Sequence, residues 1–354
     1  MKFVKPRPEQ ALNWGLVGIV LLVAALGPVI FSAYFAHTLL TQVFWYGIAA
    51  CSLIFLSAYG GMISLGQVSL YGIAGFVLGN AVTTGQVKGL HLGWDPWLGV
   101  LFAIAITTIV GFLLGAVSSR SAGIYFLMIT LAFAVLANTF FGQVTILSGF
   151  SGIGNIQNHT PGVIGNPATN PNRLYYVALV VSIAVYVICR YVTRTPFGLA
   201  LQGIRDDPIR MSSLGYNVPL HRTLAFTFGA FIASIAGVLF VWWNGQIAPG
   251  SIDLSAVIDL LVIAVIGGLF RLEGAWLGAF VFVLINNYIR NVPGLGHIGI
   301  QQERFHTVIG VIFLIIVLLS PGGLLGIWGW LTAQARRLAA SPSTTAGPAS
   351  EPGV

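Results

Sequence analysis

The chain has 354 residues, of which 56% are hydrophobic, 12% are aromatic and only 7% are charged, and its mean hydropathy is +0.90. No soluble domain hides so much apolar surface, so this composition excludes a soluble globular protein and predicts an all-α integral membrane protein. The net charge of +7 arises from basic residues in loops and at chain ends, without a patch interleaved with aromatic residues, which argues against nucleic-acid binding.

Apolar segments separated by polar or glycine-rich turns predict a polytopic helical bundle of about ten transmembrane helices. Residues 1–10 form an N-terminal segment, residues 11–331 form the membrane domain, and residues 332–354 have the composition of a disordered tail. The first apolar stretch is too long for the core of a signal peptide, so we expect a retained helix. The expected spans are residues 11–36, 38–59, a third that ends near 84, 97–118, 123–147, 173–188, 223–243, 256–270, 275–289 and 305–319.

The distribution of lysine and arginine predicts the orientation of the chain. If ten spans begin from a cytoplasmic N-terminus, twelve of the sixteen basic residues fall on the cytoplasmic side and four on the outer side. Cytoplasmic loops of membrane proteins carry an excess of lysine and arginine. We therefore expect both termini and the loop at 190–222 in the cytoplasm, and the polar loop at 148–172 outside.

The loop at 190–222 is the only long run with dense charge, and it lies between two spans. Thr195 before Pro196 and Asp207 before Pro208 each supply an N-cap oxygen followed by a residue suited to the first helical position, which predicts two short helices. Gly215 can end the second of them in a left-handed conformation. Because a helix of about two turns is not stable alone in water, we expect it to dock on a partner. A solvated loop that only sets topology is the alternative.

The predicted spans contain almost no charged residue. Asp259 is the one candidate for an ion-coupling site, and its place near the outer end of a span favours an interfacial carboxylate. The chain lacks the phosphate-binding pattern G-x-x-x-x-G-K-[ST], so it has no ATPase motif of its own. Cys51 and Cys189 in apolar segments, and six scattered histidines, predict neither a disulfide nor a metal site. These features favour a permease driven by other proteins over an enzyme.

Several short patches resemble a known family. Residues 204–210 (IRDDPIR) and 214–218 (LGYNV), followed by Arg222 and Ala225-Phe226, are similar to the cytoplasmic loop of the LivM-type permeases of branched-chain amino acid ABC importers. The resemblance covers about residues 37–327. Further matching patches are SLGQ at 64–67, GIYF at 123–126, TLAF at 130–133 and SPGGL at 320–324.

This resemblance implies a permease subunit of the bacterial plasma (inner) membrane. It implies pairing with a second, homologous permease and two cytoplasmic ATPase subunits, and delivery of substrate by an extracytoplasmic binding protein. ATP would be bound only by the ATPase subunits, so no cofactor is expected on this chain. The loop would hold the coupling helix, which would lie in a groove of an ATPase. The residues expected to carry coupling are Arg205, Asp206, Asp207, Pro208, Arg210, Leu214, Gly215 and Tyr216.

Small, polar or amphipathic residues at membrane depth could line a route for a zwitterion with an apolar side chain. Gly60 and Gly61 interrupt the apolar pattern just before the first of them, and irregular backbone at such depth needs protein or a water-filled cavity around it. The substrate stays open between branched-chain and other amino acids, urea and short amides. The candidate pathway residues are Ser64, Gly66, Gln67, Tyr71, Tyr125, Thr130 and Asn138.

Two other functions stay open. An ion-coupled secondary transporter or facilitator of small polar solutes would use Asp259 and would transport on its own. An intramembrane enzyme would use the sequence Gly149-Phe150-Ser151-Gly152, which has the G-x-S-G shape of rhomboid-type serine proteases but lies in a polar loop. This four-residue match is weak, and a glycine-rich turn is the favoured interpretation of it.

Overall fold

A computed structural model describes residues 35–84 and 89–290, together with Gly310 and Gly323. Within these residues the protein is helical and has no β-strand; an isolated bridge between Ile153 and Ile247 joins two loops. In chain order the helices are η1 (Phe35–Leu40), α3 (Thr41–Gly60), α4 (Gln67–Val82), α5 (Pro96–Ser118), α6 (Ile124–Gln143), η2 (Ile156–His159), α7 (Pro171–Val192), α8 (Pro196–Asp206), α9 (Pro208–Ser213), α10 (Val218–Asn244), η3 (Pro249–Ile252), α11 (Leu254–Gly267) and α12 (Gly274–Arg290).

The described helices include six that are long and apolar enough to cross a membrane. Each expected span between residues 38 and 289 coincides with a helix, although the apolar helices Gln67–Val82 and Gly274–Asn287 are shorter than the six long apolar stretches, one of which combines η3 with α11. The protein is therefore a multi-pass helical membrane protein. The expected spans at 11–36 and 305–319 lie outside the described residues, apart from residues 35, 36 and 310. The six long spans are His37–Gly60, Pro96–Ser118, Ile124–Gln143, Pro171–Val192, Val218–Asn244 and Pro249–Gly267.

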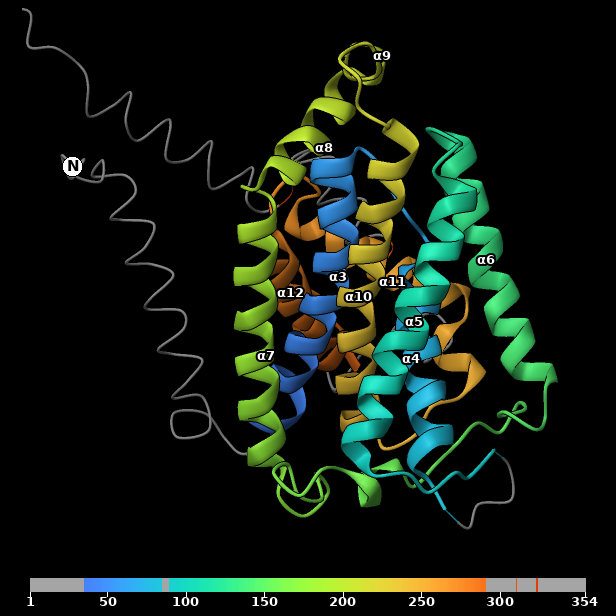
Figure 1. Ribbon diagram of the computed structural model, residues 1–354. Coiled ribbons are helices and arrows are strands. Elements are labelled where there is room, and N and C mark those ends of the chain that lie inside the picture. The colour runs from blue at the N-terminus through green and yellow to red at the C-terminus, as the bar shows by residue number, and fades with distance from the viewer. Residues whose placement is uncertain (1–34, 85–88, 291–309, 311–322, 324–354) are drawn as a thin grey trace, which may run out of the picture.

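Helix α3 is the centre of the bundle (Figure 1). It packs against α10, α12 and α7, and α10 in turn packs against α4 and α5. The most apolar stretch of α3 is 89% buried, whereas those of α5, α6 and α7 are only 22%, 28% and 33% buried. Helices α5, α6 and α7 therefore present wide apolar faces to lipid or to another subunit.

Glycines allow the closest helix contacts. A methyl group added at Gly111 of α5 would overlap the Ala230 side chain of α10, and one added at Gly278 of α12 would overlap the carbonyl oxygen of Ile263 in α11. Small residues at such positions let two helix backbones approach closely, as is common where helices pack in membranes.

Two details of the predicted layout change. The expected spans 11–36 and 38–59 leave His37 between them, whereas in the structure His37 lies in the π-helical turn Phe35–Leu40, which continues into α3. The sequence FAHTLL contains neither glycine nor proline to end a helix there. The loop predicted at 190–222 is also shorter, since α7 continues to Val192 and α10 begins at Val218.

Candidate functional site

The segment between α7 and α10 forms two short helices, as the sequence predicts. The Thr195 hydroxyl accepts a hydrogen bond from the Gly198 amide at 3.4 Å, at the start of α8. The Asp207 carboxylate accepts one from the Arg210 amide at 2.9 Å, at the start of α9. Each cap satisfies an amide that the helix cannot pair internally, so both helix starts are encoded locally.

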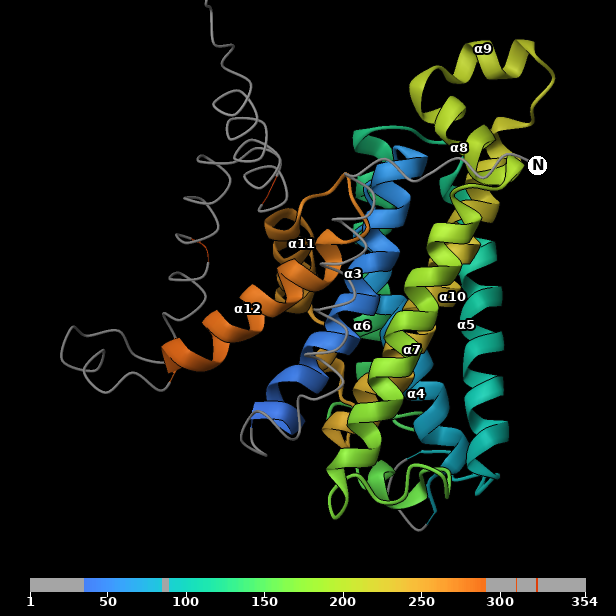
Figure 2. The same ribbon diagram turned by 90° about the vertical axis from the view of Figure 1, so that its left-hand side faces the viewer.

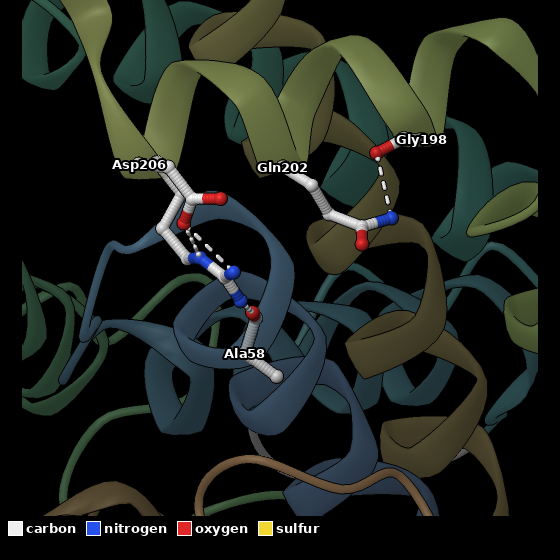
Figure 3. Close-up of polar contacts among 5 residues, drawn as sticks. Ala58, Gly198, Gln202 and Asp206 are labelled. Carbon is white, nitrogen blue, oxygen red and sulfur yellow. Dashed lines mark hydrogen bonds and ion pairs between the residues drawn. The ribbon is translucent and has the colours of Figure 1, made fainter.

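Helix α8 is fixed to the membrane bundle. It buries Leu201 and Ile204 on one face, and at its end the Arg205 guanidinium donates a hydrogen bond to the carbonyl oxygen of Ala58 in α3 (Figure 3). The same guanidinium forms an ion pair with Asp206, with 2.8 Å between Arg205 Nη2 and Asp206 Oδ1. The end of α3, the central helix of the bundle, is thus joined directly to α8.

Helix α9 has no buried residue and lies beyond the ends of the long helices (Figure 2). Its apolar residue Ile209 is 79% exposed, and Leu214 and Tyr216, just after it, are 65% and 43% exposed. Gly215 adopts a φ of 90°, which confirms the predicted left-handed turn. Exposed apolar side chains on a helix this short are typical of a surface that docks on another protein.

The α8–α9 hairpin, residues 193–217, is held in shape from within. Met211 of α9 packs on Gly203 of α8, where an added methyl group would stand 2.8 Å from its sulfur. The ring of His221 in α10 lies 5.9 Å from that of Phe197 and 5.6 Å from that of Tyr216. The eight predicted coupling residues, Arg205 to Tyr216, all lie in this hairpin, with Arg205 at the α3 contact and the others at or near α9.

Three of the predicted pathway residues meet where α3 ends and α4 begins. Helix α3 stops at Gly60, and Gly61 has a φ of 64°. In the irregular stretch that follows, the Gly66 amide donates to the buried Ser64 hydroxyl at 3.2 Å, and the Leu65 amide donates to the Thr130 hydroxyl of α6 at 3.2 Å. The polar side chains thus satisfy backbone groups at a break in the helical structure, as burial requires.

Gln67 lies among α3, α4 and α10. Its Oε1 accepts a hydrogen bond from the Ser52 hydroxyl at 3.1 Å, and a methyl group added at Gly229 of α10 would stand 3.7 Å from its Nε2. Nε2 is shielded from solvent and has no acceptor among the described residues. An unpaired amide in such a place is costly, which makes Gln67 the pathway candidate with capacity to bind a further polar group.

Tyr71 and Asn138 both bind the short helix η3. The Tyr71 hydroxyl donates to the Ser251 carbonyl at 2.8 Å, and the Asn138 amide donates to the Pro249 carbonyl at 2.7 Å. Tyr125 is the pathway candidate that stays apart: it lies in the first turn of α6 and is 73% exposed. Ser52 and the η3 carbonyl groups could not be predicted as partners from the sequence, because they come from other helices.

Several candidates for other chemistry lie apart from these two clusters. The Cys51 and Cys189 sulfurs are buried and 3.7 Å apart, as free thiols that join α3 to α7. In the part of the chain that the structure describes, no three His, Cys, Asp or Glu side chains gather as metal ligands do. Ser151 is exposed in the loop between α6 and η2.

Comparison with known proteins gives a consistent result. A family model described as "Branched-chain amino acid transport system / permease component" matches residues 35–318. The permease protein LivM of Salmonella typhimurium, from a high-affinity branched-chain amino acid transport system, is 25% identical over 257 residues, which are 66% of this chain and 58% of the relative. The chain thus spans somewhat less than two thirds of that relative's length.

Two relatives from other organisms align over more of their own length. A probable branched-chain amino acid transport permease protein LivM of Methanocaldococcus jannaschii is 25% identical over 273 residues, 71% of this chain and 75% of the relative. The permease protein BraD of Pseudomonas aeruginosa, from a high-affinity branched-chain amino acid transport system, is 26% identical over 231 residues, 63% of this chain and 72% of the relative. No solved structure matches the chain.

Proposed function

The chain belongs to the family of branched-chain amino acid transport permeases, of the LivM type, and we propose that it is the membrane subunit of an ATP-binding cassette importer that carries branched-chain or other small amino acids. It is a transport permease, and its relatives are membrane permease subunits rather than enzymes. ATP hydrolysis is assigned to partner subunits, since the sequence lacks a phosphate-binding loop.

The proposed complex contains a second, homologous permease, two cytoplasmic ATPase subunits and an extracytoplasmic binding protein that supplies the substrate. It lies in a bacterial plasma membrane, with about ten spans and both termini in the cytoplasm. The wide apolar faces of α5, α6 and α7 leave room for lipid and for the second permease.

The α8–α9 hairpin is the observation that best supports this proposal. Its exposed end presents Ile209, Leu214 and Tyr216 to a groove of the ATPase, and its fixed end is joined to α3 through Arg205 and Ala58. Movement of the ATPase pair would displace α9, and the rigid connection through α8 would pass that displacement to the central helix. Substrate would move along a route near Ser64, Gly66, Gln67 and Thr130.

The test is purification together with the proteins encoded beside it, in mild detergent, followed by mass spectrometry and uptake of radiolabelled leucine in proteoliposomes. We expect ATPases and a second permease to remain bound, and uptake to require both ATP and a binding protein.

The same experiment separates the alternatives. A chain that purifies alone and takes up leucine or urea without ATP would establish a secondary transporter or facilitator, and Asp259 would be the first residue to change. Replacement of Ser151 with alanine should leave uptake unchanged; loss of a proteolytic activity in that variant would instead revive the intramembrane enzyme.

A further inference from the structure

A small pocket opens at the end of the bundle that carries α8 and α9. Its volume is about 240 Å³, and it lies between the α3–α4 connection, the α5–α6 connection and the first turns of α6 and α10. The lining includes Met62, Ile63, Phe126, Leu127 and a single charged residue, Arg222. Neither the coupling role of the hairpin nor the predicted pathway residues account for this pocket.

Arg222 is the unusual member of the lining. Its Nε atom is shielded from solvent and has no hydrogen-bond partner among the described residues. None of the residues that line the pocket is acidic. A guanidinium in a partly buried site without an anion is unfavourable, and it is satisfied best by a planar carboxylate, which it can bind through two nitrogens.

Apart from Arg222 and Ser121, the lining consists of apolar residues and glycines. Met62, Ile63, Phe126 and Leu127 surround the space, and the glycines Gly61 and Gly123 leave room beside them. The volume is below the ~300–1,000 Å³ of sites for drug-sized ligands. The pocket therefore fits a compact molecule that has one anionic group and one apolar group.

The pocket adjoins the cluster of predicted pathway residues. The carbonyl oxygen of Leu127, a lining residue, accepts a hydrogen bond from the Thr130 hydroxyl at 3.0 Å. The same hydroxyl pairs with the amide of Leu65, two residues beyond the lining residue Ile63. A solute that passed Ser64 and Thr130 toward the α8–α9 end would reach Arg222 next.

We propose that this pocket is a binding site for the carboxylate of an apolar amino acid on the cytoplasmic side of the permease, with Arg222 as the carboxylate ligand. This inference rests on the proposed function, because it takes the substrate to be such an amino acid. The site would hold the substrate briefly before release and would give a preference for a carboxylate over a neutral amide or urea.

The test uses the whole importer in nanodiscs and L-photo-leucine, a leucine analogue whose diazirine attaches to nearby residues on irradiation. We expect labelled peptides that contain Ile63 or residues 124–127. An excess of 4-methylpentanoate, which keeps the carboxylate and the side chain, should suppress the label. Isoamylamine, which lacks the carboxylate, should not.

Variants then show whether labelling depends on the charge of Arg222 or only on correct folding. Arg222→Gln should reduce labelling at the pocket by about tenfold, and Arg222→Lys should reduce it less, because the charge remains while two-point binding is lost. Arg120→Gln is the matched control: Arg120 is exposed at the same end of the bundle, next to the lining residue Ser121, and its loss should leave labelling unchanged. Each variant is first checked for assembly and melting temperature, and if Arg222→Gln fails to assemble, Arg222→Lys and the competitors decide.

Leucine uptake by the same preparation shows whether a negative labelling result contradicts this inference alone or the proposed function as well. Uptake without label at the pocket, or label that Arg222→Gln leaves intact, would overturn this inference and leave the proposed function standing. Failure of both uptake and labelling would count against both. A phosphate of an anionic lipid is the competing occupant: if phosphatidylglycerol in the nanodisc abolishes the label and is retained by the wild type but not by Arg222→Gln, the carboxylate assignment is wrong.

Discussion

The Arg205 guanidinium donates a hydrogen bond to the carbonyl oxygen of Ala58, at the end of α3 (Figure 3). Ala58 lies in the last turn of that helix, where carbonyl groups run out of amide partners. A cation at a helix C-terminus is also favoured by the helix dipole. This one contact therefore joins the exposed α8–α9 hairpin to the central helix of the bundle.

Arg205→Ala should weaken coupling more than it weakens the fold. The guanidinium is partly exposed, with 37% of the side chain accessible, so its loss should cost only about 1 kcal/mol of stability. Uptake of leucine per ATP hydrolysed should fall severalfold in proteoliposomes. Arg194→Ala is the control, because the exposed Arg194 side chain has no hydrogen-bond or ion-pair partner among the described residues. An unchanged ratio of uptake to hydrolysis in Arg205→Ala would contradict the mechanical role of the contact.

Asp207→Ala should loosen α9 locally. The carboxylate caps this six-residue helix through the Arg210 amide, and loss of such a cap costs about 1 kcal/mol. Hydrogen exchange at amides 210–213 should become about fivefold faster. Asp207→Ser should retain most of the protection, and Ser212→Ala, at an exposed position without a side-chain partner among the described residues, should retain all of it. Equal exchange in Asp207→Ala and the wild type would show that the cap is unimportant.

Ile209→Asp should release the ATPase without disturbing the permease. Burial of an isoleucine side chain at an interface contributes about 1.5–3 kcal/mol, so affinity should fall by about tenfold or more. Co-purified ATPase measures this loss. Val163→Asp is the control, because it also places an aspartate at an exposed apolar residue; Val163 is 69% exposed in the loop between α6 and α7. If both variants retained the ATPase equally, α9 would not be its docking surface.

Features that depend on neighbouring residues in the chain were predicted from the sequence, whereas contacts between distant segments were not. Apolar segments predicted the helices from α3 to α12, and the caps at Thr195 and Asp207 predicted α8 and α9, because these signals are local in the chain. The Arg205–Ala58 contact and the unpaired Nε of Arg222 were not predicted, since their surroundings come from segments far apart in the sequence. The same reason separates Tyr125 from the other pathway candidates: its residue type fitted the pattern, but the face of α6 on which it lies could not be read from the sequence.

Gly278→Ala should destabilise the contact between α11 and α12. The added methyl group would overlap the Ile263 carbonyl oxygen and stand 2.8 Å from the Gly267 amide nitrogen. Overpacking of this kind costs about 1–3 kcal/mol, which a melting curve in detergent would detect. Gly162→Ala is the control, because nothing lies within 4 Å of the position that its methyl group would take. Equal melting temperatures of the two variants would mean that α11 and α12 accommodate the added methyl group without loss of stability.

The effects of Tyr71→Phe and Asn138→Leu on the free energy of unfolding should be coupled, although the two residues lie on different helices. The two side chains donate hydrogen bonds to the carbonyl groups of Ser251 and Pro249, so they hold η3 from α4 and from α6. Each substitution should cost about 1 kcal/mol. Once one bond is lost, η3 can shift, and the second bond contributes less.

A double-mutant cycle on the free energy of unfolding in detergent measures this dependence. We expect a coupling of at least about 0.5 kcal/mol between Tyr71→Phe and Asn138→Leu. Thr108→Val supplies the reference pair with Tyr71→Phe: its hydroxyl bonds only within α5, to the Ile104 carbonyl at 2.7 Å, so the two effects should add within about 0.3 kcal/mol. Strict additivity of Tyr71→Phe with Asn138→Leu would mean that η3 does not move as a unit. In that case α6, which packs on η3 and α4, could shift along the pathway without disturbing Tyr71.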